Sequence, residues 1–376
     1  MTTADNQPPF DVVMALTYYT PYVSGLTDAA RAVAEHLARH GQRVCVVTTR
    51  HDPRLPRTET IRGVHVVRTG VVARIGKGVI SPSFVPTIRR LSNGASVLNI
   101  HLPMLEAGAI ALACRGPELV TTYQCDVAVS GPGRLERLQR AVIDYSSGVA
   151  LRRSAAIGVS SDDYARSSRV WSAMAGRTRE IAPPTVERTP GDPIYRETPG
   201  MHVGFLGRIV EEKGLEYLVD GFLAAAEPDD RLLIGGDYTR IAGGSVVEKV
   251  RRSIGDDPRV RLLGFIPDET VDSFYASLDV FALPSVNSFE AFGIVQVEAM
   301  LMGIPSLTSD LPGVRTPVER TGFGVVVRRA DAAAIADGLR ALRANPPNPA
   351  LCDRVRELYG GGASVEAYRR LFDDLR

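Results

Sequence analysis

Short runs of apolar residues alternate with longer amphipathic stretches along almost the whole chain. Residues 11–16 and 44–49 are rich in apolar residues, which indicates buried strands. Between them, residues 26–40 carry apolar residues on one face and predict a helix that ends at Gly41. Further strands of the first half are expected at 64–67, 97–100, 119–123 and 156–159. Largely apolar strands separated by helices predict parallel pairing with both faces of the sheet covered.

Prolines interrupt this pattern between residues 182 and 200, and the alternation restarts at residue 201. In the second half we expect a helix at 215–225 and strands at 201–205, 232–234, 260–263, 280–283 and 305–308. The sequence therefore predicts an α/β protein with two Rossmann-like domains that face each other across a cleft. The expected parts are an N-terminal domain over 1–184, a linker over 185–200, a C-terminal domain over 201–364 and a final helix over 365–376. Ligands of such sheets bind beyond the carboxyl ends of the strands.

Composition and charge narrow the class of protein. The 376 residues contain 44 Lys+Arg and 43 Asp+Glu, a net charge of +1, which argues against a nucleic-acid-binding protein. The four cysteines are scattered, so neither a disulfide scaffold nor a structural zinc site is expected. The N-terminal residues lack a signal-peptide pattern and no apolar run is long enough to span a bilayer, so we expect a cytoplasmic protein. Only Lys77, Lys213 and Lys249 are lysines, so each of the three is of interest.

Residues 285–300 carry candidate chemistry because an apolar strand leads there into an apolar helix. Phe292, Gly293 and Ile294 would present free backbone N–H groups at the start of that helix, which suits a phosphate. Glu290 precedes the helix and Glu298 lies inside it, so the two carboxylates could flank one ligand. The alternative is a solvated Glu298 and a Glu290 that only complements the helix dipole.

A second stretch, residues 204–214, ends a strand and places two cations in the loop that follows. Arg208 and Lys213 would suit a diphosphate whose negative charge grows as a bond breaks. An ordinary surface loop remains the alternative, because Glu211 and Glu212 could pair with both cations.

Together these stretches resemble family 4 of the retaining glycosyltransferases, which have the GT-B architecture. The resemblance implies that the final helix, 365–376, crosses back to the first domain. Glu290 and Glu298 match the family's E-x7-E pattern. The signature G-R-x4-K-G is matched by Gly207, Arg208, Lys213 and Gly214. Residues 263–267 resemble the segment beside the donor base, and Ile266 is assigned a backbone contact there on that ground alone.

The resemblance implies transfer of a sugar from a nucleotide diphosphate sugar, a UDP- or GDP-sugar, to a hydroxyl acceptor with retained configuration. Arg208 and Lys213 would stabilise the leaving diphosphate together with the helix that starts near Phe292. Glu298 would bind the ribose and Glu290 the sugar hydroxyls. The resemblance implies neither a cofactor nor a metal site.

The N-terminal half carries a partial match to the same family. Gly25 follows Ser24 where relatives have two glycines, and it would let the backbone approach the donor phosphate or the acceptor. His101 follows a strand and resembles the H-x-P histidine that faces the donor sugar. Gln124 stands where a second histidine is common, and Asp126 could bind an acceptor hydroxyl or cap the following segment.

Several alternatives stay open. The same scaffold serves nucleotide-sugar epimerases and phosphorylases, and a nucleotide-sugar-binding protein without catalysis is also compatible with the altered motifs. The acceptor could be a glycan, a lipid-linked glycan or a small natural product. Residues 79–90 and 133–140 combine apolar residues with arginines, as peripheral membrane surfaces do, although solvated amphipathic helices have the same composition.

Overall fold

The computed structural model of the chain describes residues 10–22, 24–75, 78–127, 133–238 and 246–376, so Val23 and Lys77 lie outside the described residues. The chain divides into two compact units. The first unit comprises Met1–Pro184 and Ser364–Arg376, and the second unit comprises Thr185–Ala363.

The first unit is built on a sheet with the strand order β10-β9-β8-β7-β1-β2-β4-β3. Its strands are β1 (Val12–Ala15), β2 (Val44–Thr49), β3 (Thr58–Ile61), β4 (Val64–Thr69), β7 (Val97–Leu102), β8 (Glu118–Tyr123), β9 (Ala156–Val159) and β10 (Thr178–Glu180). All neighbours pair in parallel except β3 and β4. That antiparallel edge differs from the expected parallel pairing because only Arg62 and Gly63, both with positive φ, connect the two strands. A separate hairpin consists of β5 (Ala73–Ile75) and β6 (Gly78–Ile80).

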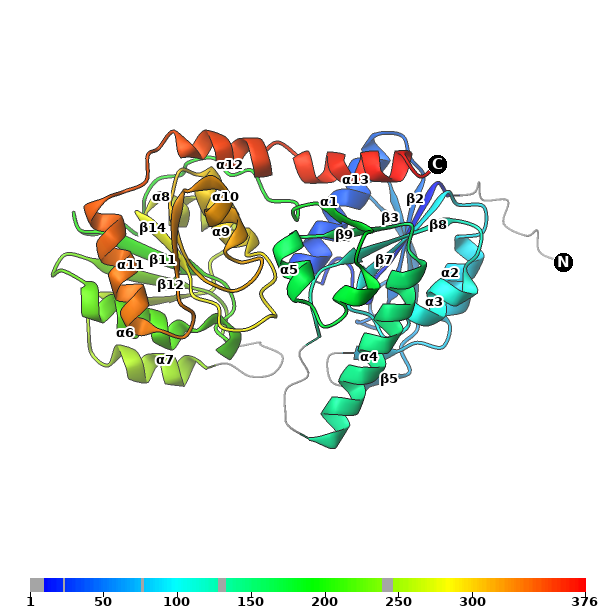
Figure 1. The fold of residues 1–376 in the computed structure, drawn as a ribbon, viewed down its shortest axis with the longest axis horizontal. Helices are drawn as coiled ribbons and strands as arrows, with labels where there is room; N and C mark the ends of the chain where they lie inside the picture. The colour runs from blue at the N-terminus through cyan, green and yellow to red at the C-terminus, as the bar shows by residue number, and fades with distance from the viewer. Residues whose placement is uncertain (1–9, 23, 76–77, 128–132, 239–245) are drawn as a thin grey trace. The chain divides into compact units, whose positions relative to one another are not determined.

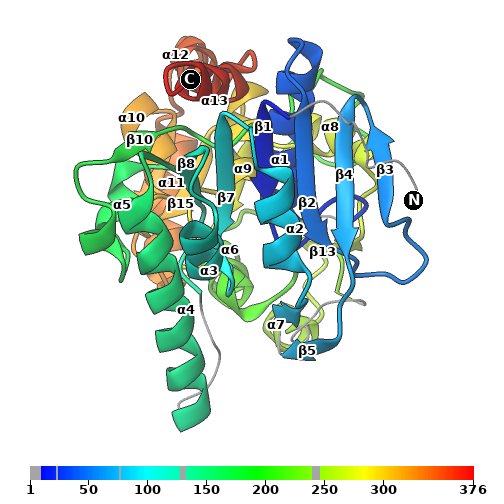
Figure 2. The ribbon, with the colours of Figure 1, turned by 90° about the vertical axis from the view of Figure 1, so that its right-hand side faces the viewer.

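Helices cover the faces of this sheet (Figure 2). They are α1 (Gly25–Arg39), α2 (Phe84–Leu91), α3 (Ala107–Ala113), α4 (Arg134–Arg153), α5 (Asp162–Ser167) and α13 (Ala363–Asp373). The last helix, expected over 365–376, buries Tyr368 and Phe372 in the same core as Val12 and Leu37. The C-terminal residues therefore complete the hydrophobic core of the first unit.

The second unit contains a six-stranded parallel sheet with the order β13-β12-β11-β14-β15-β16 (Figure 1). Its strands are β11 (His202–Leu206), β12 (Arg231–Gly235), β13 (Val260–Gly264), β14 (Val280–Leu283), β15 (Ser306–Ser309) and β16 (Gly324–Val327). Its helices are α6 (Leu215–Ala225), α7 (Val247–Ile254), α8 (Asp268–Ala276), α9 (Ile294–Leu301), α10 (Thr316–Thr321), α11 (Ala332–Ala344) and α12 (Leu351–Tyr359). The strand order reverses between β11 and β14, and ligands of open α/β sheets bind at such a switch point.

The segment 185–200, expected as a linker, packs against the second unit instead. Thr185 Oγ1 donates to Tyr359 O at 3.0 Å, and Arg196 pairs with Asp279 at 3.1 Å. The prolines exclude this segment from a sheet, and individual polar groups of it bond to the second unit instead. It is therefore part of a folded unit.

Candidate functional site

At the switch point of the second unit, the stretches 204–214 and 285–300 lie in contact. The loop after β11 contains Glu212 and Gly214, and the loop after β14 contains Pro284 and Val286. Val286 N donates to Glu212 O at 2.9 Å. Gly214 has φ of +63°, and a Cβ there would lie 2.5 Å from Pro284 O. Glycine is thus required where the two loops touch.

Lys213 and Glu290 form an ion pair at this contact. Their side chains are only 12% and 17% exposed, so water screens the pair weakly. Arg208 pairs with Glu212 at 3.4 Å and is more than half exposed, as the surface-loop alternative expected. The structure therefore separates the two cations: Lys213 joins the loops, whereas Arg208 stays accessible to a ligand.

The N-terminus of α9 lies in the second of these loops. Gly293 precedes the helix with φ of +81°, and no side chain of the described residues caps it. The Gln296 side chain holds the chain in place where it enters α9, by donating to Phe292 O at 2.8 Å and to Val314 O at 2.7 Å. The first N–H groups of a helix lack intrahelical acceptors, so the backbone at Ile294 is available to an anion.

Glu298 is buried, with 6% of the residue exposed, which rules out the solvated alternative. Its carboxylate accepts hydrogen bonds from Arg188 Nε at 3.2 Å, Tyr275 Oη at 3.3 Å and Val186 N at 3.5 Å. Burial raises the pKa of Glu298 above its ordinary value, although the Arg188 charge and these hydrogen bonds lower it in part. Arg188 was not among the residues expected from the sequence.

The backbones at the carboxyl ends of β11, β12 and β13 lie in direct contact with one another. Gly207 N donates to Gly235 O at 3.0 Å, and a Cβ on Gly236 would lie only 1.7 Å from Gly207 O. The Ile266 side chain is buried against Gly235, which leaves its backbone for the contact implied by the resemblance. Gly236 thus permits the close backbone approach, whereas the missing side chain of Gly235 makes room for Ile266.

In the first unit, His101 lies near the carboxyl end of β7 and is 3% exposed. Burial lowers the pKa of His101 to about 4, so the imidazole is neutral at neutral pH. Its Nδ1 lies 3.4 Å from Gln124 Nε2, while Nε2 is buried without a partner among the described residues. The glutamine that replaces the family's second histidine is thus a direct neighbour of His101.

Asp126 and Gly25 have clear local roles. The Asp126 carboxylate accepts hydrogen bonds from Tyr123 and from Ser168 Oγ, the latter at 2.9 Å, and lies 3.5 Å from Arg169. These contacts favour the structural alternative for Asp126 over acceptor binding. Gly25 is the first residue of α1, which Ser24 caps by accepting a hydrogen bond from Thr27 N.

A group of aromatic rings, unexpected from the sequence, lies at the same edge of the first sheet. Tyr18 and Tyr22 follow β1 and stack with ring centroids 4.6 Å apart. His51 follows β2 and meets Tyr22 edge-on at 5.5 Å. We call these three residues the aromatic ledge; no local pattern marks them, because the rings come from two loops.

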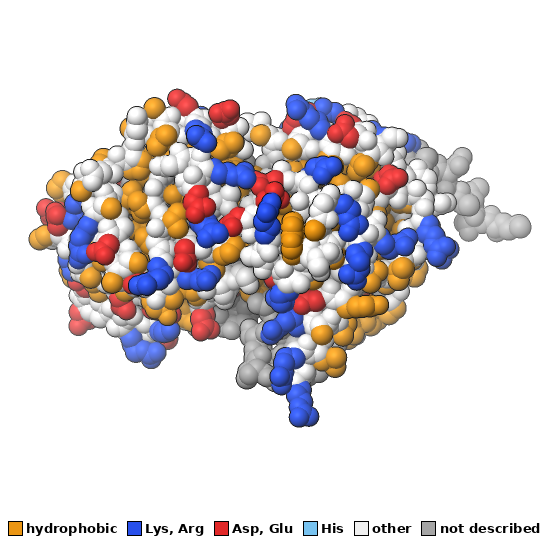
Figure 3. All heavy atoms as spheres, viewed as in Figure 1, with side chains coloured by type: hydrophobic (Ala, Val, Ile, Leu, Met, Phe, Trp, Pro, Cys, Tyr) orange, Lys and Arg blue, Asp and Glu red, His pale blue; other side chains and the backbone are white. Residues whose placement is uncertain are grey.

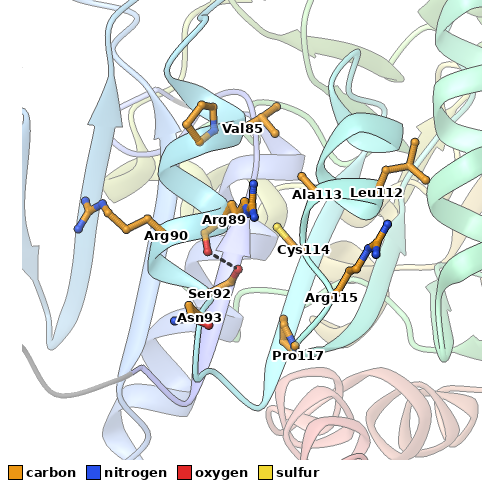
Figure 4. A pocket seen from close by; sticks show the side chains of 12 residues that line it. Val85, Arg89, Arg90, Ser92, Asn93, Leu112, Ala113, Cys114, Arg115 and Pro117 are labelled. Atoms are coloured by element: carbon orange, nitrogen blue, oxygen red, sulfur yellow. Dashed lines mark hydrogen bonds between the residues drawn. The ribbon is translucent and has the colours of Figure 1, made fainter.

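A surface groove lies elsewhere in the first unit, away from these residues. It has a volume of about 880 Å³ and lies between the C-terminal ends of α2 and α3, near Arg89 and Arg115 (Figure 4). It lies at the amino end of β7 and β8, and no residue expected in the site lines it.

Charged and apolar side chains also mix on the surface around α4 (Figure 3). Leu138, Val142 and Tyr145 are exposed on that helix at helical spacing. Among the helices described, none has the length and apolar character needed to cross a bilayer. Peripheral membrane contact through 79–90 or 133–140 stays a prediction.

Comparison with known proteins identifies glycosyltransferase domains in both halves of the chain. Residues 24–184 match the glycosyl transferase 4-like domain, and residues 200–345 match glycosyl transferases group 1. The chain is 36% identical over 178 residues to phosphatidyl-myo-inositol mannosyltransferase of Mycobacterium leprae, covering 46% of this chain and 42% of that protein. It is 30% identical over 234 residues to 2-deoxystreptamine glucosyltransferase of Streptomyces kanamyceticus, covering 56% and 58%. The chain thus spans about half the length of these curated relatives.

Solved structures share the fold. Sucrose-phosphate synthase from Thermosynechococcus elongatus has a TM-score of 0.78 at 22% identity, covering 97% of this chain and 98% of that one. HepE from Anabaena, in complex with UDP and glucose, has a TM-score of 0.68 at 17% identity, covering 96% and 99%. The expected fold and family are confirmed: the chain belongs to the family 4 glycosyltransferases and has their GT-B fold, with two Rossmann-like domains.

Proposed function

We propose that this protein transfers a sugar from a nucleotide diphosphate sugar to a hydroxyl acceptor and retains the anomeric configuration. The observation that carries the proposal is the Lys213–Glu290 ion pair at the switch point between β11 and β14, beside the uncapped start of α9. A cation, a carboxylate and free N–H groups converge there, which suits a ligand with both phosphates and sugar hydroxyls.

Each of these groups has a role in the proposed reaction. Arg208, Lys213 and the α9 N-terminus stabilise the charge that develops on the diphosphate as the bond between the anomeric carbon and the phosphate oxygen breaks. Glu290 accepts hydrogen bonds from the donor sugar, and Glu298 from the ribose. The acceptor oxygen bonds to the anomeric carbon from the same face, and its proton passes to the leaving phosphate oxygen. These cationic groups perform the charge stabilisation, so we propose a metal-independent reaction; the role of His101 toward the donor sugar stays a prediction.

For the acceptor we propose a polyol ring of the cyclitol type. The relatives include the mannosyltransferase and the glucosyltransferase above and a D-inositol 3-phosphate glycosyltransferase of Corynebacterium kroppenstedtii, which is 31% identical over 37% of this chain. Their names contain phosphatidyl-myo-inositol, 2-deoxystreptamine and D-inositol 3-phosphate, each of which includes a hydroxylated cyclohexane ring. The aromatic ledge supports this class, because ring faces pack well against the C–H faces of such polyols.

The first experiment is a thermal-shift screen with UDP, GDP, ADP and dTDP, followed by incubation of the matching sugar nucleotides with myo-inositol, D-inositol 3-phosphate or 2-deoxystreptamine. We expect an α-linked product from an α-linked donor, detected by NMR, with and without EDTA. A change of the sugar nucleotide without acceptor would indicate an epimerase, and a requirement for free phosphate would indicate a phosphorylase. Nucleotide binding without turnover of any donor would indicate a binding protein.

A further inference from the structure

Arg188 connects three carboxylates of the second unit. Its side chain is 10% exposed, and its guanidinium reaches Glu298 at 3.2 Å, Asp272 at 3.1 Å and Asp268 at 3.0 Å. The guanidinium carbon also lies 6.0 Å from the centre of the Tyr275 ring. Arg188 comes from the segment 185–200, so this segment reaches a residue that the proposed function assigns to the ribose.

The charge on Glu298 depends on this contact. A buried carboxylate without a cation tends to take up a proton, because burial penalises the ionised form. Among the described residues, the groups that face Glu298 are the Arg188 guanidinium, the Val186 N–H and the Tyr275 hydroxyl. From α12, the Cys352 thiol reaches Met300 O instead, and the Tyr359 ring packs on Phe292. Arg188 is therefore the nearby positive charge that offsets burial.

The two oxygens of Glu298 are used unequally. Oε2 accepts from Arg188 Nε and from Tyr275 Oη, at 3.2 and 3.3 Å. Among the described residues, Oε1 accepts from Val186 N alone, at 3.5 Å, which is long for a hydrogen bond. A carboxylate oxygen can accept two hydrogen bonds, so Oε1 retains capacity for a hydroxyl donor.

We propose that Arg188 is a positioning residue for the nucleotide: it binds Oε2 of Glu298, keeps the carboxylate ionised and leaves Oε1 for the ribose diol. This inference rests on the proposed function, since it takes the ligand to be a ribonucleotide. Arg188 itself does not contact the ligand and acts through Glu298.

The test measures the binding of UDP, GDP and ADP, each beside its 2′-deoxy counterpart, by calorimetry between pH 5.5 and 8.5. The variants are Arg188→Met, Arg188→Lys, Glu298→Gln and the double variant Arg188→Met/Glu298→Gln. Arg196→Met is the matched control, because Arg196 lies in the same segment and pairs with Asp279, away from Glu298. Thermal unfolding of every variant verifies that it is folded.

The wild type should bind one ribonucleotide more tightly than its deoxy form. Arg188→Met should weaken that binding about tenfold or more at neutral pH and reduce the preference for the ribose. Without Arg188 the pKa of Glu298 rises further, so the loss of affinity on acidification should begin at a higher pH than in the wild type. The double variant lacks the Glu298 carboxylate and should show no such pH dependence, and Arg188→Lys should restore part of the affinity.

The outcomes separate the two proposals. A wild type that binds none of the six nucleotides contradicts the proposed function and this inference with it. A wild type that prefers the ribonucleotide, beside an Arg188→Met variant with the same preference and the same pH profile, overturns the inference alone. Tighter binding by Arg188→Met would show that Arg188 competes with the ligand, which also overturns it. If Arg188→Met does not fold, the inference is tested with two other variants. These are Arg188→Lys and the double variant, which has neutral side chains at positions 188 and 298.

Discussion

The carboxyl edges of the two sheets are built from different chemistry on similar frameworks. In the second unit, Lys213 pairs with Glu290 between loops that need glycine to touch, and Arg188 of the segment 185–200 pairs with Glu298 of α9. In the first unit, the corresponding edge carries the Asp126–Arg169 ion pair but also a neutral buried imidazole, His101, and the stacked rings of Tyr18 and Tyr22. Ion pairs suit a diphosphate and ribose, whereas neutral groups suit a polyol. The comparison indicates that a parallel sheet supplies the place for a ligand and the loops supply its chemistry.

The largest effect concerns the independence of the two units. Phe372→Ala removes a fully buried ring of α13 from the core of the first unit, and we expect a loss of about 3–5 kcal/mol in its unfolding free energy. Phe222→Ala is the matched change in the core of the second unit. Hydrogen exchange should show each loss in its own unit; equal loss of protection in both units for either variant would contradict this division.

The next largest effect is on turnover, and it distinguishes the charged residues at the carboxyl edge of the second sheet from charged residues elsewhere on the surface. Lys213→Ala should lower kcat about 10²–10³-fold, because it removes a cation from the developing diphosphate charge. Glu290→Ala and Arg208→Ala should also lower turnover strongly. Lys249→Ala is the control, since Lys249 on α7 pairs with Glu216 on α6, and this change should leave steady-state turnover unchanged. Unchanged turnover in all three site variants would eliminate the proposed site.

The neutral state of His101, at the carboxyl edge of the first sheet, is tested by measuring stability as a function of pH. The pKa of His101 is about 4 in the folded protein and near 6.5 in the unfolded chain, so between these values the unfolded state binds more protons. The unfolding free energy should therefore fall by about 3 kcal/mol as the pH drops from 7 to 4 through this group. Denaturant titrations of His101→Asn should show a flatter pH dependence by that amount. Equal slopes in the two proteins would mean that the imidazole is not held neutral.

The smallest expected effect comes from replacing Gly214, and it tests whether the loop contact in the second unit requires glycine. Gly214→Ala forces a side chain into positive φ and against Pro284 O, which should cost about 1–3 kcal/mol and separate the loops that carry Lys213 and Glu290. We expect a lower Tm together with weaker nucleotide binding. Gly255→Ala, at another positive φ but with no atom within 4 Å of the added Cβ, should lower Tm without affecting binding.

Local patterns in the sequence predicted much of the fold and part of the site. The helix at 215–225 and the strand at 280–283 occur at the expected residues, because continuous apolar runs and periodic faces are local signals. The antiparallel β3 and the folding of 185–200 onto the second unit were not predicted. Both depend on partners that no local pattern identifies.

The sequence by itself determined two α/β halves and the family, because the apolar pattern is local and the motifs are short and carry fixed spacing. Only the tertiary structure decided which charges meet. Lys213 reaches Glu290 rather than its sequence neighbours, Arg188 holds Glu298 from 110 residues away, and Asp126 is bound within the fold. The physical reason is that charge pairing in a buried site depends on which loops the sheet order brings together, and strand order is a property of the whole chain.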